Sequence, residues 1–430
     1  MLRPIQLRTI MGIRAAYARG ARRILIVAPT GYGKTVVLAH IVASHVARGG
    51  KVVIVVHRRE LVGQTVSKLH AAGVGHVGVI AAGETADPNA LVQVCMVQTM
   101  LARDAYPFAT MLIIDEAHHF VAEEWSQVAA HYTDVLTLGF TATPMRADGT
   151  PLGDIFEEIF VAASIKELIG LNFLVPCDVV APPKKTRSNC AEVIASYAKH
   201  GGNRPAVIFA AGVQDARDLA AEFAAAGISA ACVDGETDDD LRDQTIARFA
   251  TGDLQILTNV YCLVEGWDAP RAEVMILARG CGHVGTYLQM IGRILRPAPG
   301  KDRALLIDLR GAVHTHGMPE DDRVFSLEGK AISEGDAPVR TCPECEHVCA
   351  LACRVCPSCD YEFPAPDYGD ESAELVKITK AEVERGYFVS ALDEANRRGY
   401  KPGYAAHRFQ EKFGRFPAKF WRELVSRRAA

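Results

Sequence analysis

Short apolar runs recur along the first 335 residues and alternate with segments of helical spacing. Five runs come first: Ile24–Val27, Val52–Val56, Val92–Val97, Met111–Ile114 and Val135–Leu138. After a break, five more follow: Val207–Phe209, Ala230–Val233, Gln255–Leu257, Val274–Leu277 and Ala304–Ile307. Such runs, separated by helices, are typical of parallel strands buried on both faces of a sheet. The pattern predicts an α/β protein of two lobes, which we place at residues 1–165 and 166–335.

The pattern changes after about residue 335. A segment dense in cysteine is followed by the proline-containing residues 364–370 and then by a basic segment of helical spacing. We predict a small zinc ribbon at residues 336–365 and a basic helical tail at residues 372–430.

The composition is that of a globular protein, with 49% hydrophobic and 23% charged residues. The net charge of −4 means that any nucleic-acid-binding surface must be local. The apolar runs are far shorter than the ~20 residues that cross a bilayer, so no membrane partner is expected. The arginine-rich start is similar to a targeting leader, but the phosphate-binding motif that begins at Ala28 leaves no room for a removable one. We therefore expect a cytoplasmic protein.

The first apolar run leads into residues 28–35, with the sequence APTGYGKT. This is a P-loop in which Ala28 replaces the usual first glycine. Gly31 and Gly33 allow the backbone to wrap closely around phosphate oxygens, and the N-terminus of the following helix favours an anion. Lys34 is expected to reach the β- and γ-phosphates of ATP, and Thr35 to bind Mg²⁺. The alternative is an ordinary glycine-containing turn between a strand and a helix.

Two carboxylates follow the run Met111–Ile114 directly. Asp115 and Glu116 therefore stand at the end of a buried strand, where parallel sheets bind nucleotides. We expect Asp115 to hold the metal ion, and Glu116 to orient and deprotonate the attacking water. An acidic surface turn is the alternative.

The four residues 115–118, Asp-Glu-Ala-His, resemble the motif that names the DEAH-box helicases of superfamily 2. Further segments resemble motifs of that superfamily in the expected order: 2–6 with Gln6 of the adenine-reading motif, 56–61, 98–99, 139–144, 207–209, 258–268 and 289–296. The resemblance covers about residues 1–310. It implies two RecA-like lobes that bind and hydrolyse Mg-ATP between them.

The resemblance also implies roles for single residues. Those expected to bind or hydrolyse ATP are Gln6, Thr30, Gly31, Gly33, Lys34, Thr35, Asp115, Glu116, Gly266, Asp268, Gln289, Arg293 and Arg296. Arg293 and Arg296 lie three residues apart on one side of a helix, from which both would meet the γ-phosphate across a closed cleft. Residues expected to couple hydrolysis to movement are His118, Thr141 and Thr143. Expected contacts with nucleic-acid phosphates are Arg58, Arg59, Thr99 and Thr258, with an ordinary solvated side chain as the alternative.

Two Cys-x-x-Cys pairs, Cys342/Cys345 and Cys356/Cys359, are separated by ten residues. Four thiolates placed by two tight turns complete a tetrahedral Zn²⁺ site. Cys349 and Cys353 add two more thiols, which either substitute for one pair or pack nearby. A redox dithiol and an iron–sulfur cluster are the alternatives.

The tail is strongly basic, because residues 395–430 contain ten arginines and lysines against two glutamates. Phe409, Phe413, Phe416 and Phe420 recur within it at helical spacing, which favours a small core over a base-stacking platform. We expect the charge to give an accessory grip on DNA, with a solvated face as the alternative. Residues 401–407 and 412–414 are similar to the tail of short bacterial and phage helicases of the RadD-like group, in which a zinc-binding segment also follows the two lobes.

The sequence thus predicts an ATP-dependent DNA helicase or translocase that acts on single-stranded or forked DNA in repair, recombination or phage replication. Other replication or repair proteins are its expected partners. The first alternative is an RNA-dependent ATPase or RNA helicase, since the same motifs serve both polymers. The others are a zinc-and-DNA-binding adaptor with a weak motor, and a restriction-type motor subunit that needs a separate nuclease chain.

Metal analysis tests the cysteine assignment. We expect about one equivalent of zinc per chain, because four thiolates complete one tetrahedral site. A zinc content below about half an equivalent, together with an iron–sulfur absorption band, would reject the assignment.

Overall fold

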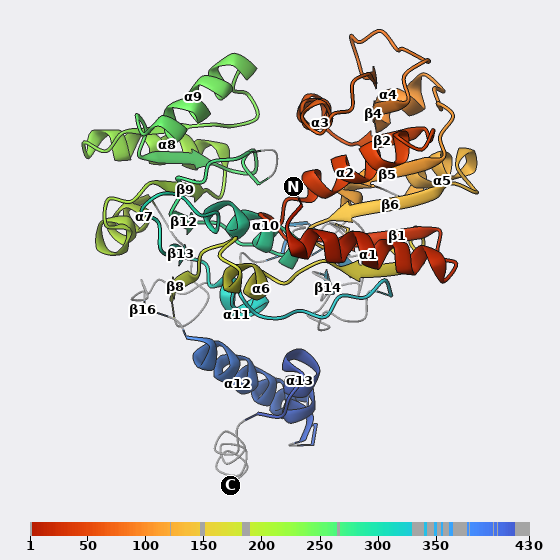
Figure 1. The fold of residues 1–430 in the computed structure, drawn as a ribbon. Coiled ribbons are helices and arrows are strands. Elements are labelled where there is room, and N and C mark those ends of the chain that lie inside the picture. The colour runs from red at the N-terminus through yellow and green to blue at the C-terminus, as the bar shows by residue number, and fades with distance from the viewer. Residues whose placement is uncertain are drawn as a thin grey trace.

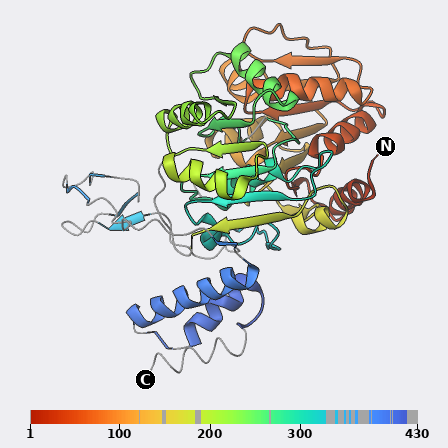
Figure 2. The ribbon, with the colours of Figure 1, turned by 90° about the vertical axis from the view of Figure 1, so that its left-hand side faces the viewer.

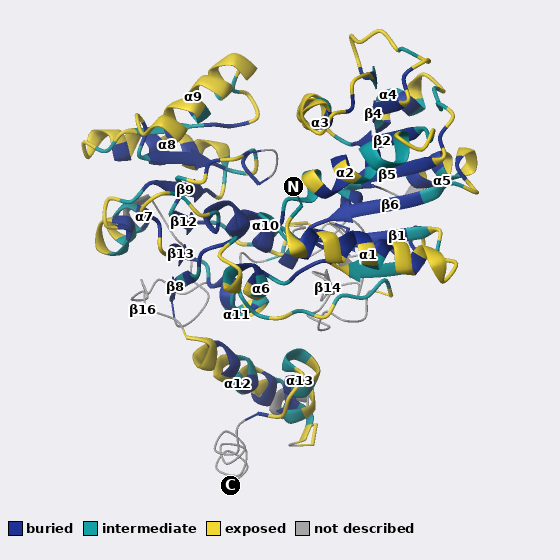
Figure 3. Cartoon of the chain, viewed as in Figure 1, coloured by how far each residue is buried: buried dark blue, intermediate teal, exposed yellow. Residues whose placement is uncertain are grey.

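The computed structural model of the 430-residue chain describes residues 2–120, 122–146, 151–182, 190–264, 267–328, 339–341, 348–350, 354–355, 361–363, 376–377, 379–398, 400–401 and 403–417. Its main body is two α/β lobes that lie beside each other (Figure 1). Each lobe has one sheet as its buried centre, and the outward faces of its helices are exposed (Figure 3).

The first lobe contains a parallel sheet with the strand order β3-β4-β2-β5-β6-β1-β7. Its strands are β1 (Arg23–Val27), β2 (Val52–Val56), β3 (Val77–Ile80), β4 (Val92–Met96), β5 (Met111–Asp115), β6 (Leu136–Thr141) and β7 (Glu158–Val161). The register pairs Val27 with Thr141, and Asp115 with Phe140. The P-loop, the acidic pair and Thr141 therefore meet at one edge of the sheet.

Helices connect these strands in the right order for a doubly wound sheet. They are α1 (Pro4–Ala18), α2 (Lys34–Val46), α3 (Arg59–Ala71), α4 (Val97–Ala102), the 3₁₀ turn η1 (Ala117–His119) and α5 (Ala122–His131). Proline at the first position of α1 fits a helix start, where no backbone N–H is needed. The buried face of α1 includes Ile5, Gln6 and Thr9, so two polar side chains of this helix pack against the lobe.

The second lobe repeats the plan, with the strand order β10-β11-β9-β12-β13-β8-β16. Its strands are β8 (Cys177–Ala181), β9 (Ala206–Phe209), β10 (Ala230–Cys232), β11 (Ile256–Asn259), β12 (Val274–Leu277), β13 (Ala304–Asp308) and the antiparallel β16 (Val376–Lys377). Its helices are α6 (Ile165–Gly170), α7 (Cys190–Ser196) with the π-helical η2 (Tyr197–Gly201), α8 (Val213–Ala225), α9 (Asp239–Thr251), α10 (Val284–Ile294) and α11 (Ala312–His316). The central strands are buried along their whole length.

Four of the fourteen sheet strands were not predicted, and each lacks a continuous apolar run. β3 and β7 are edge strands whose side chains alternate or lie only half buried. β8 carries Asp178, which forms an ion pair with Arg303 at 2.9 Å. β16 has only two residues. Three of these, β3, β7 and β16, are edge strands, which lack a neighbour on one side and so carry a weaker apolar signal than central strands.

After the second lobe the chain returns to the first one. The backbone N–H of Gly153 donates to the carbonyl oxygen of Leu327 at 3.1 Å, and Phe325 and Leu327 pack on the apolar cluster of the first lobe. Lys166 and Asp322 add an exposed ion pair at 3.7 Å. Residues 325–327 therefore give the chain that follows the second lobe a further contact with the first lobe.

The C-terminal helices α12 (Lys380–Arg398) and α13 (Gly403–Phe413) form a separate pair, which lies below the lobes in both views (Figures 1 and 2). Phe388 and Phe409 meet edge to face in its small core, with ring centroids 6.0 Å apart. The core interpretation is confirmed for Phe409, whereas Phe416 is 43% exposed and Phe420 lies outside the described residues. Lys412 donates to the carbonyl oxygen of Thr315 at 2.9 Å and so attaches the pair to the second lobe.

The predicted zinc ligands Cys342, Cys345, Cys356 and Cys359 lie outside the described residues. Next to them in the sequence, β14 (Val339–Thr341) precedes Cys342, and it pairs with β15 (Val348–Ala350) as an antiparallel hairpin. Across the described ranges, no cluster of histidine, cysteine and acidic side chains could hold a metal ion. Among the helices that the structure describes, none is long and apolar enough to cross a membrane.

Candidate nucleotide site between the two lobes

The P-loop leaves β1 at Val27 and enters α2 at Lys34. Gly31 and Gly33 both adopt a φ of +88°, in the left-handed region that favours glycine. A Cβ atom on Gly31 would also lie 2.4 Å from Leu174 Cδ2. The glycine positions of the motif are therefore required by backbone conformation and by space.

Side chains of helix α1 form hydrogen bonds with Tyr32 of this loop. Gln6, which is 2% exposed, accepts from the backbone N–H of Arg3 at 3.0 Å and donates to the carbonyl oxygen of Tyr32 at 3.2 Å. The hydroxyls of Tyr32 and Thr9 lie 2.5 Å apart, and burial raises the pKa of Tyr32. Gln6 was predicted, but Tyr32 and Thr9 were not. An aromatic residue between the two glycines of a phosphate loop was the available signal, because so large a side chain needs a buried place.

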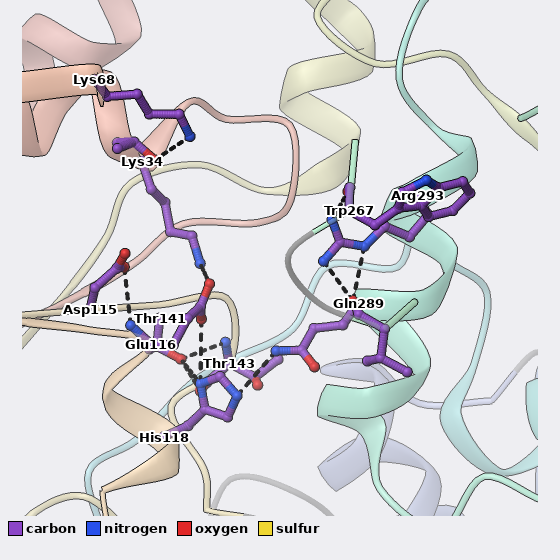
Figure 4. Close-up of polar contacts among 12 residues, drawn as sticks. Lys34, Lys68, Asp115, Glu116, His118, Thr141, Thr143, Trp267, Gln289 and Arg293 are labelled. Carbon is purple, nitrogen blue, oxygen red and sulfur yellow. Dashed lines mark hydrogen bonds and ion pairs between the residues drawn. The ribbon is translucent and has the colours of Figure 1, made fainter. Parts of the chain in front are cut away.

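The charged residues of the site already contact one another (Figure 4). Lys34 Nζ lies 2.5 Å from Glu116 Oε1, and both side chains are mostly buried. The backbone N–H of Glu116 donates to Asp115 Oδ1 at 3.0 Å. Burial and the neighbouring Glu116 charge raise the pKa of Asp115 to about 6. Thr35 accepts from Lys68 at 3.3 Å, so a second lysine stands at the start of α2.

His118 sits at the centre of a buried hydrogen-bond network. Thr141 donates its single hydroxyl proton to the carbonyl oxygen of Thr143 at 2.6 Å, so it accepts from His118 Nδ1 at 3.0 Å. Gln289 Nε2 donates to His118 Nε2 at 3.1 Å. This network assigns the Nδ1–H tautomer to the neutral ring. The same Nδ1 lies 3.5 Å from Glu116 Oε2, which links the network to the acidic pair.

The hydrogen bond from Gln289 crosses from the second lobe to the first. Two glycines on the same helix, α10, allow this close approach. A Cβ atom on Gly292 would lie 2.5 Å from Thr30 Cβ of the P-loop, and one on Gly285 would lie 2.7 Å from Thr143 Oγ1. Side chains at both positions would therefore separate the lobes.

The two arginines of α10 are held by their own lobe. Arg293 donates to the carbonyl oxygens of Val264, at 2.6 and 2.9 Å, and Trp267, at 2.5 Å (Figure 4). Arg296 forms an ion pair with Asp268, whose side chain is 74% exposed. These contacts all lie within the second lobe, so the expected meeting of both arginines with the γ-phosphate stays a prediction. Gly266 lies outside the described residues.

The predicted nucleic-acid contacts fall into two groups. Arg58 and Arg59 are exposed at the start of α3, and Thr99 is half buried in α4. The prediction for Thr258 needs a correction. Thr258 is fully buried in β11 and donates its hydroxyl to the carbonyl oxygen of Ala216 at 2.6 Å, so a strand on the surface does not reach it.

A stack of imidazoles, which was not predicted, connects the acidic pair with the strand end before Arg58. The rings of His57 and His119 are stacked with centroids 3.9 Å apart. The rings of His118 and His119 are tilted against each other, with centroids 4.0 Å apart. β2 and β5 are neighbours in the sheet, so the residues that follow them meet. Only the strand order could have revealed this contact.

Two family profiles match the chain, one within each lobe. "Type III restriction enzyme, res subunit" matches residues 1–146, and "Helicase conserved C-terminal domain" matches residues 186–298. The second profile is that of a helicase domain, and curated relatives of the chain include named helicases. Together, these matches support an ATP-hydrolysing, nucleic-acid-dependent helicase.

Curated relatives of this helicase share about a quarter of its residues. A 51.5 kDa protein of a Lactococcus phage (isolate 7-9) is 27% identical, over 84% of this chain and 83% of its own length. The putative mitochondrial ATP-dependent helicase irc3 of Schizosaccharomyces pombe is 27% identical, over 76% of this chain but only 60% of its own. The DNA 3'-5' translocase XPB2 of Sulfurisphaera tokodaii is 25% identical, over 67% of this chain and 77% of its own.

The fold of the helicase is also found in solved structures. A fragment of a putative HsdR subunit of a type I restriction enzyme from Vibrio vulnificus YJ016 superimposes with a TM-score of 0.56. The match covers 74% of this chain and 67% of that one, at 20% sequence identity. At this identity the likeness shows the shared fold of two RecA-like lobes.

Replacing Gly292 by alanine tests the close contact between the lobes. We expect kcat for ATP hydrolysis to fall about tenfold, because overpacking costs about 1–3 kcal/mol and about 1.4 kcal/mol is tenfold in rate. Gly386→Ala is the matched control, since Gly386 is also helical and a Cβ there meets nothing within 4 Å. Steady-state ATPase assays give the comparison, and equal kcat values for the two variants would contradict it.

Proposed function

We propose that the protein is an ATP-dependent DNA translocase or helicase in which hydrolysis is gated by contact between the lobes. The observation that carries this proposal is the bond from Gln289 to His118 at 3.1 Å. His118 also contacts Thr141 and lies near Glu116, so one imidazole touches the second lobe, the strand end of β6 and the expected catalytic base. A change in lobe position must therefore change the surroundings of Glu116.

The residues at the P-loop fit a Mg²⁺ ion. Asp115 is a buried carboxylate whose pKa is raised to about 6, and a cation beside it would stabilise its charged form. Asp115 and the hydroxyl of Thr35 are oxygen ligands of the kind that Mg²⁺ prefers. When bound, the ion would neutralise charge on the β- and γ-phosphates.

Two negatively charged groups compete for Lys34 in this mechanism. Its ammonium group pairs with Glu116 at 2.5 Å, and the phosphates of ATP compete for it with more negative charge. Transfer of Lys34 to the phosphates leaves the Glu116 carboxylate available to accept a proton from water. Gln289 and His118 then fix the position of the helix turn that follows Glu116.

Arg293 and Arg296 complete the proposed site when the cleft closes further. Arg293 is held by two backbone carbonyls, and Arg296 by Asp268. Both partners are weaker competitors than a phosphate group, so a bound γ-phosphate can attract the guanidinium groups. Hydrolysis then depends on a closed arrangement of the lobes.

DNA is the polymer we favour. The archaeal relative is named a DNA 3'-5' translocase, and the C-terminal segment resembles that of the RadD-like helicases. That resemblance also supports a zinc ribbon made by Cys342, Cys345, Cys356 and Cys359, and a role in repair, recombination or phage replication. An RNA-dependent motor is the second candidate, because the same P-loop and acidic pair would serve it.

The ATPase assay is the first test of this function. We expect DNA to stimulate turnover of the wild type, and Glu116→Gln to lower kcat by about 10²–10⁴-fold because the general base is lost. Lys34→Ala should abolish turnover, whereas Glu123→Gln, at an exposed position of α5, should leave it unchanged. Stimulation by RNA alone would overturn the choice of polymer. Absence of turnover with any polymer would contradict the proposal that the protein is an ATP-driven motor.

Deleting residues 372–430 tests the accessory grip of the tail. We expect weaker binding to single-stranded DNA and a smaller slope of log affinity against log salt, because basic residues that release counterions are removed. Fluorescence anisotropy at several salt concentrations measures both quantities. Unchanged affinity and slope would show that the tail does not bind DNA.

A further inference from the structure

Tyr261 is an exposed aromatic side chain at the carboxyl edge of the second sheet. It follows β11 by two residues, and its ring is 50% exposed. The strand ends lie in register there, since Phe209 pairs with both Asn259 and Leu277. The loops after β11, β9 and β12 therefore form one continuous edge, and Tyr261 lies at its β11 side.

Arg279 holds the tyrosine ring in a fixed position. Its guanidinium carbon lies 3.7 Å from the ring centroid, and its Nη2 donates to the Tyr261 hydroxyl at 2.6 Å. Its Nη1 donates to the carbonyl oxygen of Val260 at 3.3 Å. The ring thus has a cation on one face and a hydrogen bond at its tip, which lowers the entropy lost when a ligand stacks on it.

Hydrogen bonds fix the loop beneath the ring, and an arginine of α9 contacts it. Asn259 donates to the carbonyl oxygen of Ile208 at 3.1 Å and accepts from the backbone N–H of Leu263 at 3.3 Å. Arg242 donates to the carbonyl oxygen of Cys262 at 3.3 Å. Together with Arg279, two guanidinium groups flank the tyrosine, and a backbone of phosphates would be attracted to both.

Negative charge limits where a polyanion can cross this edge. The acidic residues after β10 are Asp234, Glu236, Asp238, Asp239 and Asp240. They would repel a strand from the β10 end of the sheet, whereas Arg279 follows β12 and lies over Tyr261, which follows β11. In the first lobe, Arg58 and Arg59 are exposed at the start of α3, and α3, α8 and α9 all lie above α10 in Figure 1.

We propose that Tyr261 is a base-stacking contact for a single-stranded nucleic acid, with Arg279 and Arg242 beside it for the flanking phosphates. This inference rests on the proposed function and names one residue that grips the polymer. Stacking is independent of base identity because every base has an aromatic face, so it suits a motor that moves along any sequence. The contact replaces the one expected from the buried Thr258.

The same loop leads directly to the ATP site. The carbonyl oxygen of Tyr261 accepts from the backbone N–H of Val264 at 3.1 Å, and the carbonyl oxygen of Val264 accepts from Arg293. A base on Tyr261 would therefore bind to the loop that positions Arg293. Nucleic acid and ATP would act on the two ends of one short segment.

Binding of matched oligonucleotides tests the proposal. Fluorescence anisotropy compares a labelled oligothymidylate with a strand of equal length that has abasic sites, so that the number of phosphates is the same. We expect Tyr261→Ala to weaken binding of oligothymidylate about tenfold, to leave the abasic strand unaffected and to keep the salt slope. Tyr261→Phe and Tyr261→Trp keep a ring, and both should bind oligothymidylate within about twofold of the wild type or more tightly.

Phe108→Ala is the matched control. Phe108 is 72% exposed and has the Lys51 ammonium 6.0 Å from its ring centroid, but it precedes β5 at the opposite edge of the first sheet. Its loss should not change binding. Wild-type affinity of Tyr261→Ala for oligothymidylate would overturn the proposal, and so would an equal loss on both strands. A wild-type protein that binds neither strand would overturn the proposed function itself.

Discussion

The hydrogen bond between Gln289 and His118 is the contact on which the arrangement of the site depends. It joins a helix of the second lobe to the turn that follows the acidic pair of the first. Both side chains are buried, and an unpaired polar group in such a place costs about 1–3 kcal/mol. The net gain from a made bond is only about 0.5–1.5 kcal/mol. A hydrogen bond of this kind therefore favours one arrangement of the lobes and can still break and form again in each cycle of ATP hydrolysis.

Close packing makes this bond possible. Gly285 and Gly292 lie seven residues apart on α10, on the same face as Gln289, and their missing side chains let the helix approach Thr143 and Thr30. A single methylene group at either position would move the amide of Gln289 away from the imidazole. The sequence of this helix is thus constrained by the width of the cleft as well as by its apolar face.

The lobes also stay together by contacts that do not involve the P-loop. Phe325 and Leu327 pack on the first lobe after the chain has completed the second one, and the backbone N–H of Gly153 donates to the carbonyl oxygen of Leu327. These contacts limit how far the lobes can separate when the bond to His118 breaks. The proposed contact of Tyr261 with nucleic acid would be linked to the ATP site, because the loop that bears Tyr261 also holds Arg293.

The sequence by itself determined the two lobes, the P-loop and the acidic pair, since each depends on local pattern: buried parallel strands are apolar along their whole length, and phosphate loops need glycine at set positions. It did not determine the strands β3, β7, β8 and β16, which carry no continuous apolar run. Only the tertiary structure decided that Thr258 faces the interior, that His57 stacks on His119, and that Tyr261 is held beneath Arg279. Each of these facts depends on which strands are neighbours, and strand order arises from long-range packing that no local spacing records.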